Sequence, residues 1–212
     1  MSQSSRNARF WDRAARKYSA DPIADEAGYE RSLARTAEFM QAADQVFEFG
    51  CGTGTTALKL APHCAHLLAT DISPEMIAIA QEKAVAQGAP NVAFEVGLIN
   101  DERWRHNSFD LALGFNILHL LDERQAALAA LHGLLKPGGL FISKTPCLSE
   151  MSFAIHLALP LMKAIGKAPH VDTFSEATLT GEIGQAGFDI IACERHGTRG
   201  KDIRAFIIAR KR

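Results

Sequence analysis

The chain has 212 residues, 47% of them apolar and 22% charged, which is the composition of a folded globular protein and excludes a disordered one. Its 23 basic and 24 acidic residues leave a net charge of −1. Nucleic acid is therefore not an expected partner, because duplex-binding proteins carry a basic excess. The four cysteines form no C-x-x-C pair. This argues against a disulfide framework or a metal site and favours a reducing, cytoplasmic location.

No segment of the sequence is suited to crossing a membrane. The first 18 residues are polar and lack the apolar core of a secretion signal. The most apolar later stretch, residues 151–165, is interrupted by His156, Pro160 and Lys163 and is too short to span a bilayer. We expect no transmembrane segment, whereas peripheral contact with lipid stays open, as does the choice between a monomer and a homodimer.

The expected elements change in character along the chain. Residues 6–43 are predicted to be helical, with a break at Asp21-Pro22. From residue 45 onwards, short apolar strands alternate with helices, which predicts a parallel sheet with helices on both faces. The expected strands are 46–49, 67–70, 92–96, 109–113 and 140–144, and the expected helices are 54–62, 74–87, 101–105 and 122–135. Two further strands, 189–194 and 203–209, are joined so briefly that they must be antiparallel.

This pattern predicts a single domain over residues 1–212. Residues 6–43 would form a helical cover and residues 45–145 a ligand-binding core. Residues 146–175 are expected to form a lid over an apolar pocket, with an ordinary core helix as the alternative. Residues 176–212 would complete the sheet.

The most informative segment is a glycine turn that follows the first strand. Gly50, Gly52 and Gly54 alternate between residues 46–49 and the next helix, so backbone N–H groups can approach a ligand closely. The alternative is a purely structural turn. Position 55 is Thr, whereas a dinucleotide fingerprint has a third glycine there. Asp71 ends the second strand, where a carboxylate can bind a ribose diol. Its alternative role is to cap the helix after Ser73, which Ser73 can cap alone.

Glu48 stands immediately before this turn. A carboxylate there would repel a pyrophosphate but would suit an ammonium or sulfonium group. The charge therefore favours S-adenosylmethionine over NAD. The alternative is that Glu48 pairs with a nearby lysine or arginine.

These residues carry a family resemblance. Glu48-Phe49-Gly50-Cys51-Gly52-Thr53-Gly54 resembles the first motif of the class I S-adenosylmethionine-dependent methyltransferases, and in particular the small-molecule enzymes of the ubiquinone/menaquinone C-methyltransferase type. Residues 70–76, 108–110, 118–121, 134–139 and 186–188 are similar to later motifs of the family. The resemblance implies an α/β fold with a Rossmann-like seven-stranded sheet, mostly parallel, with an antiparallel C-terminal hairpin.

The resemblance also implies S-adenosylmethionine as cofactor and S-adenosylhomocysteine as product. It places Glu48 near the amino group, Asp71 on the ribose, and Ile72 and Met76 against the adenine, although Met76 could be a core residue. Leu98 stands where the family has an acid, so Asn100, Asp101 or water would replace that acid, while the Ile99 N–H meets the adenine. The predicted cofactor-binding set is Tyr18, Glu48, Gly50, Cys51, Gly52, Asp71, Ile72, Met76, Leu98, Ile99, Phe115 and Asn116.

A sulfonium methyl group is already electrophilic, so alignment of the acceptor can suffice for catalysis. Two residues are nevertheless candidate catalytic groups: His119, beyond the fourth strand, and Tyr18, which would fold over the cofactor; each could instead be structural. His156 and His170 lie in the insert. We expect methyl transfer to a small, apolar or aromatic molecule. The alternatives are an amine or phospholipid headgroup as acceptor, or a non-catalytic protein that binds S-adenosylmethionine or S-adenosylhomocysteine. An NAD oxidoreductase is disfavoured by Glu48 and Thr55.

Overall fold

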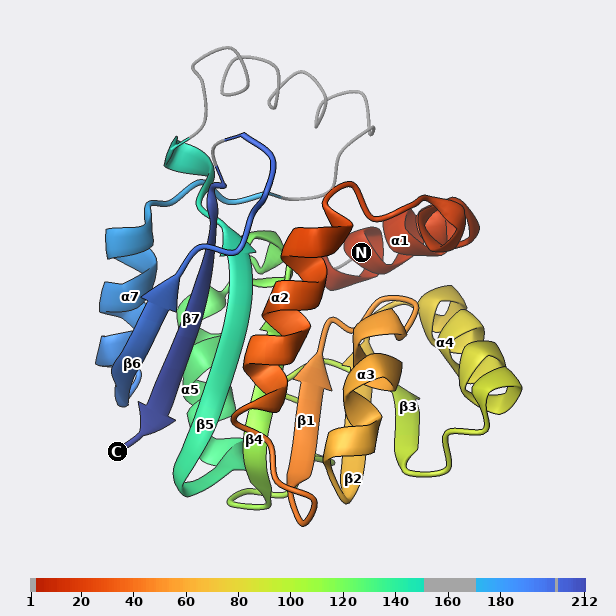
Figure 1. The fold of residues 1–212 in the computed structure, drawn as a ribbon, viewed down its shortest axis with the longest axis horizontal. Helices are drawn as coiled ribbons and strands as arrows, with labels where there is room; N and C mark the ends of the chain where they lie inside the picture. Colours follow the sequence, from red (N-terminus) through yellow and green to blue (C-terminus); the bar gives the residue numbers. More distant parts are fainter. Residues whose placement is uncertain (1–2, 151–170, 201) are drawn as a thin grey trace.

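The computed structural model describes residues 3–150, 171–200 and 202–212 and contains one seven-stranded sheet (Figure 1). The strand order is β3-β2-β1-β4-β5-β7-β6. Strands β1 to β5 pair in parallel, and β7 is antiparallel to both of its neighbours, β5 and β6. The strands are β1 (Gln45–Phe49), β2 (His66–Asp71), β3 (Val92–Val96), β4 (Phe109–Phe115), β5 (Leu135–Pro146), β6 (Phe188–Glu194) and β7 (Arg204–Lys211). The predicted fold class is confirmed.

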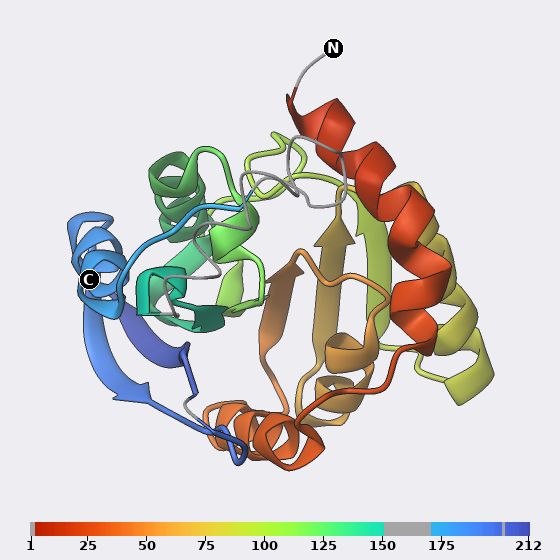
Figure 2. The same ribbon diagram turned by 90° about the horizontal axis from the view of Figure 1, so that it is seen from above.

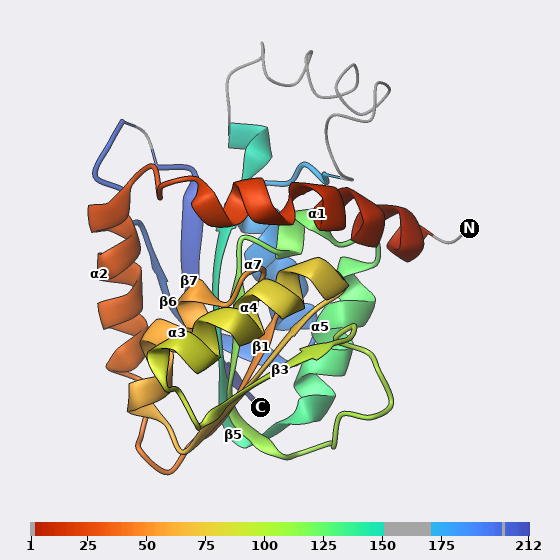
Figure 3. The same cartoon turned by 90° about the vertical axis from the view of Figure 1, so that its right-hand side faces the viewer.

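Helices cover both faces of the sheet and one of its ends. The α-helices are α1 (Gln3–Ala20), α2 (Glu26–Ala37), α3 (Thr55–Leu60), α4 (Pro74–Gln87), α5 (Arg124–Leu134) and α7 (Glu176–Gln185). Short 3₁₀ turns are η1 (Ala61–His63), η2 (Leu118–Leu120) and η3 (Leu148–Glu150). Seen from above, α2 and α3 lie on one side of the sheet and α5 and α7 on the other (Figure 2). Helix α1 lies above α4, at the end where the parallel strands finish (Figure 3).

Alternating side chains on each strand supply one hydrophobic core per face of the sheet. On β1, Phe47 packs with Phe109 of β4, and the helices α5 and α7 add Leu131 and Ile183 to the same cluster. Its neighbour Val46 belongs to the opposite cluster, which α2, α3 and α4 complete. Successive residues of a strand point to opposite faces, so a strand that is covered on both faces is mostly apolar, and the buried Glu48 of β1 is an exception. The cores leave the loops at the strand ends free to form a site.

The structure corrects the prediction of a helix at residues 101–105. Two consecutive turns occupy this segment, closed by Asp101 N–H to Leu98 O (3.1 Å) and Trp104 N–H to Asp101 O (3.1 Å). Trp104 is buried, and its ring nitrogen donates to Leu98 O at 2.6 Å. Because Asp101 also binds Arg103 two residues away, local contacts outweigh the weak helical preference of five residues.

Two further elements differ from expectation. β5 begins at Leu135 rather than near residue 140, because Leu135 pairs with Phe109 before a register shift in the ladder. Helix α7 was not predicted; Ser175 caps it by accepting from Thr178 N–H. Most of the predicted lid, residues 151–170 with His156 and His170, lies outside the described residues.

None of the helices that the structure describes has the length and apolarity needed to cross a membrane.

Gly54 should be far less replaceable than Gly138, although both have a φ of 75°. A Cβ at Gly54 would lie 2.7 Å from the Phe94 ring and 2.8 Å from the Ala80 Cβ, whereas a Cβ at Gly138 meets no described atom within 4 Å. We expect Gly54→Ala to lower the free energy of unfolding by about 3 kcal/mol or more, and Gly138→Ala by about 1–2 kcal/mol, the cost of the left-handed backbone alone. Urea denaturation of both variants measures the difference, and equal losses would contradict the clash at Gly54.

Candidate functional site

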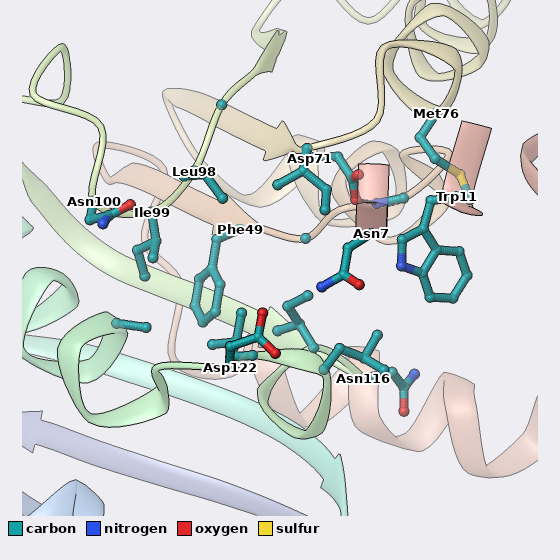
Figure 4. Close-up of a pocket in the computed structure, with 18 of the residues that line it drawn as sticks. Asn7, Trp11, Phe49, Asp71, Met76, Leu98, Ile99, Asn100, Asn116 and Asp122 are labelled. Carbon is teal, nitrogen blue, oxygen red and sulfur yellow. Dashed lines mark hydrogen bonds between the residues drawn. The ribbon is translucent and has the colours of Figure 1, made fainter. Parts of the chain in front are cut away.

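A cavity of about 250 Å³ opens at the carboxyl ends of the parallel strands. It is bounded by the loops that follow β1, β2, β3 and β4, by one side of α1 and by the start of α5 (Figure 4). Ligands of open α/β sheets bind in the crevice outside these strand ends, so the position itself is typical of a binding site. The predicted cofactor-binding residues that line the cavity are Tyr18, Gly50, Gly52, Asp71, Ile72, Met76, Leu98, Ile99, Phe115 and Asn116.

The glycine turn forms one wall of this cavity. Gly50, Gly52 and Gly54 all have positive φ values, of 66°, 54° and 75°. Cys51 N–H donates to Thr70 O at 2.9 Å, which fixes the turn to the end of β2. Lys83 of α4 stabilises the other end of the turn, since its Nζ donates hydrogen bonds to the hydroxyls of Thr53 (2.9 Å) and Thr55 (3.2 Å). The turn is therefore held in place from two neighbouring elements.

Cys51, although predicted to bind the cofactor, is not among the described residues that line the cavity. Its side chain is buried, and burial raises the pKa of its thiol well above the ordinary value. The thiol contacts the Gly52 carbonyl at 3.6 Å. Cys51 thus behaves as a small apolar residue inside the turn.

Asp71 connects the glycine turn to the start of α4. Its Oδ2 accepts from Gly52 N–H at 3.0 Å, and its Oδ1 accepts from Ser73 N–H at 2.9 Å. The helix cap itself is Ser73, whose Oγ accepts from Met76 N–H at 3.2 Å. Each carboxylate oxygen has two acceptor positions, so Asp71 retains capacity for a ligand in the cavity that it lines. Burial is the main cause of the raised pKa of Asp71.

Glu48 lies behind the cavity wall rather than in it. Its side chain is 2% exposed, and its Oε2 has no hydrogen-bond partner in the described part of the chain. Burial, followed by the charge of Asp71, raises the pKa of Glu48 to about 8. Glu48 forms no ion pair with a described lysine or arginine, so the structure gives no support to the alternative role considered for it.

The loops after β2 and β3 bring the predicted adenine-contacting residues together. Ile72, Leu98 and Ile99 line the cavity, and so does Asn100, one of the suggested replacements for the missing acid. The other suggested replacement, Asp101, does not line the cavity but binds the Arg103 side chain at 2.8 Å. Met76 has both roles considered for it. It lines the cavity, and it packs in a buried cluster with Ala15 and Ile79.

Asn116 forms the wall at the end of β4 in a strained conformation. Its φ is 54°, a left-handed value that few non-glycine residues adopt. The Asn116 N–H donates to Lys144 O at 2.7 Å, which holds this conformation. Strain of this kind often accompanies function, and here it turns the chain from β4 along the cavity.

The two candidate catalytic residues are placed differently. Tyr18 lines the cavity, and burial and the charges of Asp71 and Glu48 raise the pKa of its hydroxyl, although 51% of the residue is exposed. His119 does not line the cavity, whereas Leu120 beside it does. Burial lowers the pKa of His119 to about 4, and its Nδ1 has no partner among the described residues. The imidazole is therefore neutral at pH 7.

Sequence reasoning predicted a helical cover that contributes Tyr18, but it did not single out Asn7 and Trp11 of α1 or the start of α5 as parts of the cavity. Asn7 and Trp11 lie on α1, and Figure 4 shows the Asn7 amide directed into the cavity. Their spacing of four residues, with Tyr18 seven residues further on, could have indicated one helix face. The other unpredicted lining residues are Phe49, Gly97, Ile117, Leu120, Leu121, Asp122, Glu123, Ala126 and Ala127.

The charge of the cavity is one-sided. Asp71, Asp122 and Glu123 line it, and no lysine, arginine or histidine does so among the residues that the structure describes. A ligand with two phosphates would meet only like charge there, whereas a cationic group would be attracted.

Comparison with known proteins agrees with this chemistry. A family model described as "Methyltransferase domain" matches residues 46–139. The "uncharacterized methyltransferase YcgJ" of Bacillus subtilis is 28% identical over 110 residues, covering 52% of this chain and 43% of YcgJ. The YcgJ crystal structure superposes with a TM-score of 0.69 over 86% of this chain and 99% of that one, at 16% identity. Residues 46–139 of the chain belong to the class I S-adenosylmethionine-dependent methyltransferase superfamily.

The curated relatives of this chain do not all carry the name of a methyltransferase. The mitochondrial arginine-hydroxylase NDUFAF5 of Danio rerio is 33% identical over 95 residues, covering 43% of this chain and 29% of the hydroxylase. In sequence, the match thus spans less than half of the length of either curated relative.

Glu48 should make the stability of the ligand-free chain depend on pH. The unfolded chain loses this proton near pH 4.5, whereas the folded chain keeps it until about pH 8. Stability therefore falls as pH rises between these two values. Gln does not titrate, so Glu48→Gln should not show this loss. As pH rises from 5 to 8, its free energy of unfolding should increase by about 1–3 kcal/mol relative to that of the unmodified chain.

Denaturant titrations at several pH values measure this change. The control is Glu82→Gln, which alters an exposed residue of α4 and should keep the pH dependence of the unmodified chain. If Glu48→Gln also kept it, Glu48 would be ionised in the folded chain.

Proposed function

We propose that this chain transfers the methyl group of S-adenosylmethionine to a small molecule. The observation that carries the proposal is the acidic cavity at the strand ends, in which Asp71 lines the wall and Glu48 lies behind it without a cationic partner. A sulfonium and an ammonium group would relieve both carboxylates, whereas a pyrophosphate would add to their repulsion. Membership of the superfamily supports the same cofactor.

The residues of the cavity fit this cofactor in three places. Asp71 would accept hydrogen bonds from the ribose hydroxyls with the acceptor positions that Gly52 and Ser73 leave open. Ile72, Met76, Leu98 and Ile99 would enclose the adenine. The glycine turn would bind the methionine portion, and the Glu48 carboxyl would give up its proton to balance the ligand's positive charge. S-adenosylmethionine supplies an electrophilic methyl group when it is bound.

The chain's own part in the reaction is alignment and exclusion of water. Helix α1 would cover the cavity from one side. The lid predicted at residues 146–175, most of which lies outside the described residues, would cover it from another. Closure of this kind raises the local concentration of the acceptor and removes competing water. His119 stays a candidate for accepting a proton because its low pKa keeps it neutral, although it lies behind the cavity wall beside Leu120. Tyr18, which lines the cavity, would contact the acceptor from the cover.

We favour a small apolar or aromatic acceptor, since Phe49, Ile117, Leu120 and Leu121 form an apolar part of the wall. Asp122 and Glu123 line the same region and favour the second candidate, an amine or phospholipid headgroup. Incubation of a cell extract with methyl-labelled cofactor separates the two. The label would enter a product without a cationic group in the organic phase for an apolar acceptor. For the second candidate it would enter a cationic product, which is water-soluble for a free amine and lipid-soluble for a phospholipid. Bound S-adenosylhomocysteine without any labelled product would indicate a binding protein instead.

The cofactor assignment can be tested by calorimetry. We expect S-adenosylmethionine and S-adenosylhomocysteine to bind in about the micromolar range and NAD not to bind measurably. Asp71→Asn keeps one oxygen that can accept a hydrogen bond from the backbone. Its other oxygen becomes an NH₂ group, which cannot accept the hydrogen bond that a ribose hydroxyl would donate. This variant should weaken S-adenosylhomocysteine about tenfold or more. The exposed acid Glu75 offers a matched control, and Glu75→Gln should leave affinity unchanged. Tight binding of NAD, or full affinity in a folded Asp71→Asn variant, would overturn the assignment.

The proton-transfer role of His119 has a kinetic signature. Because its pKa is about 4, the rate at saturating substrates should be flat between pH 6 and pH 8. His119→Ala should lower kcat about a hundredfold, with little change in the KM for the cofactor. Tyr18→Phe, which removes only the hydroxyl, should lower kcat less. If both variants kept the original kcat, alignment alone would account for the reaction and no base would be needed.

A further inference from the structure

Helix α1 is fastened to the start of α4 by one carboxylate. The Oδ1 atom of Asp12 accepts from the Ser73 Oγ–H at 2.6 Å and from the Glu75 N–H at 3.3 Å. Negative charge is favourable at this point, because the first turn of a 14-residue helix presents unpaired N–H groups and the positive end of its dipole. Asp12 thus adds a second cap to α4 from another element.

Apolar contacts surround this polar one. Ala15 of α1 packs with Met76 and Ile79 of α4 in a buried cluster, and Trp11 packs against it. Asp12 and Ala15 are three residues apart and so lie on one side of α1. The docked side of α1 therefore joins a half-buried hydrogen-bond acceptor to a small apolar patch, which fixes both the position and the rotation of the helix.

The rotation of α1 about its axis also determines which of its side chains line the cavity. Asn7, Trp11 and Tyr18 of α1 all line it. At the end of α1, the Tyr18 ring lies 3.6 Å from where a Cβ would stand on Gly52. A change in the rotation of α1 would move these three side chains together, because a helix is rigid over this length.

Ser73 connects Asp12 to Asp71, the carboxylate proposed to bind the ribose. Its Oγ–H goes to Asp12, its Oγ accepts from Met76 N–H, and its N–H goes to Asp71. Asp71 in turn accepts from Gly52 N–H. A continuous line of hydrogen bonds thus runs from the cover helix to the glycine turn. The charge of Asp12 also contributes to the raised pKa of Asp71.

We infer that Asp12 is a positioning residue, which holds α1 in the rotation that places Asn7, Trp11 and Tyr18 over the bound cofactor. This role rests on the proposed function, since it assumes S-adenosylmethionine in the cavity. A cofactor that touches both α1 and Asp71 should stabilise the docked helix, and by linkage the docked helix should stabilise the bound cofactor. When the competent state is only partly populated, apparent affinity falls by the same fraction.

The test combines affinity with local protection. We expect Asp12→Ala to weaken S-adenosylhomocysteine about tenfold in calorimetry. Asp12→Asn keeps an oxygen that can accept from Ser73 and Glu75, so it should lose less affinity. Asp21→Ala removes an exposed acid just after α1 and should bind as the unmodified chain does. At saturating S-adenosylhomocysteine, amide hydrogen exchange in residues 5–20 should be faster in Asp12→Ala than in the unmodified chain, while the sheet amides stay equally protected.

Each other result has a separate meaning. If Asp12→Ala binds with full affinity and keeps α1 protected, the positioning role is wrong. It is also wrong if protection of α1 and of the sheet falls in parallel, because Asp12 would then contribute only general stability. If the unmodified chain does not bind S-adenosylhomocysteine, the proposed function fails and the role of Asp12 fails with it.

Discussion

The carboxylate of Asp71 is the interaction on which the geometry of the site depends. Its two oxygens hold Gly52 N–H and Ser73 N–H, which belong to two different strand-to-helix connections. The glycine turn after β1 and the first turn of α4 are therefore placed relative to each other by one side chain at the end of β2. Since Ser73 also holds Asp12, the position of α1 depends on the same point. The cavity is assembled around a single buried acid.

This arrangement has an energetic cost that only a ligand can remove. Glu48 and Asp71 are both buried near the turn, and each has a raised pKa. An apolar residue in place of Glu48 would make the ligand-free chain more stable, because the Glu48 Oε2 is buried and has no partner among the described residues. Retention of an unpaired carboxyl is what one expects where a ligand's positive charge completes the site. The loss of stability with rising pH that we expect of the ligand-free chain and the proposed preference for a cationic ligand thus have one physical cause.

The sequence was sufficient for the sheet because each strand is apolar in a local run. Residues 92–96 were predicted with the observed bounds, and the antiparallel end followed from a short connection. It was not sufficient where tertiary contacts decide. Residues 101–105 form turns because Trp104 is buried and binds Leu98 O. The orientation of Asn7 and Trp11 towards the cavity depends on the hydrogen bond between Asp12 and Ser73, which is 61 residues away along the chain. Periodicity predicts that a helix has an apolar side, but not what that side covers.

Docking of α1 by both polar and apolar contacts also constrains how a ligand can leave. The cover cannot lift without breaking the hydrogen bonds of Asp12 and exposing the apolar contacts among Ala15, Met76 and Ile79. Yet Met76 itself lines the cavity, so a ligand against Met76 adds to the surface that holds α1 down. Release of product should then require the helix contacts to weaken first, because ligand and helix share the same residues. The interactions that position the cover are in this way the ones that limit its opening.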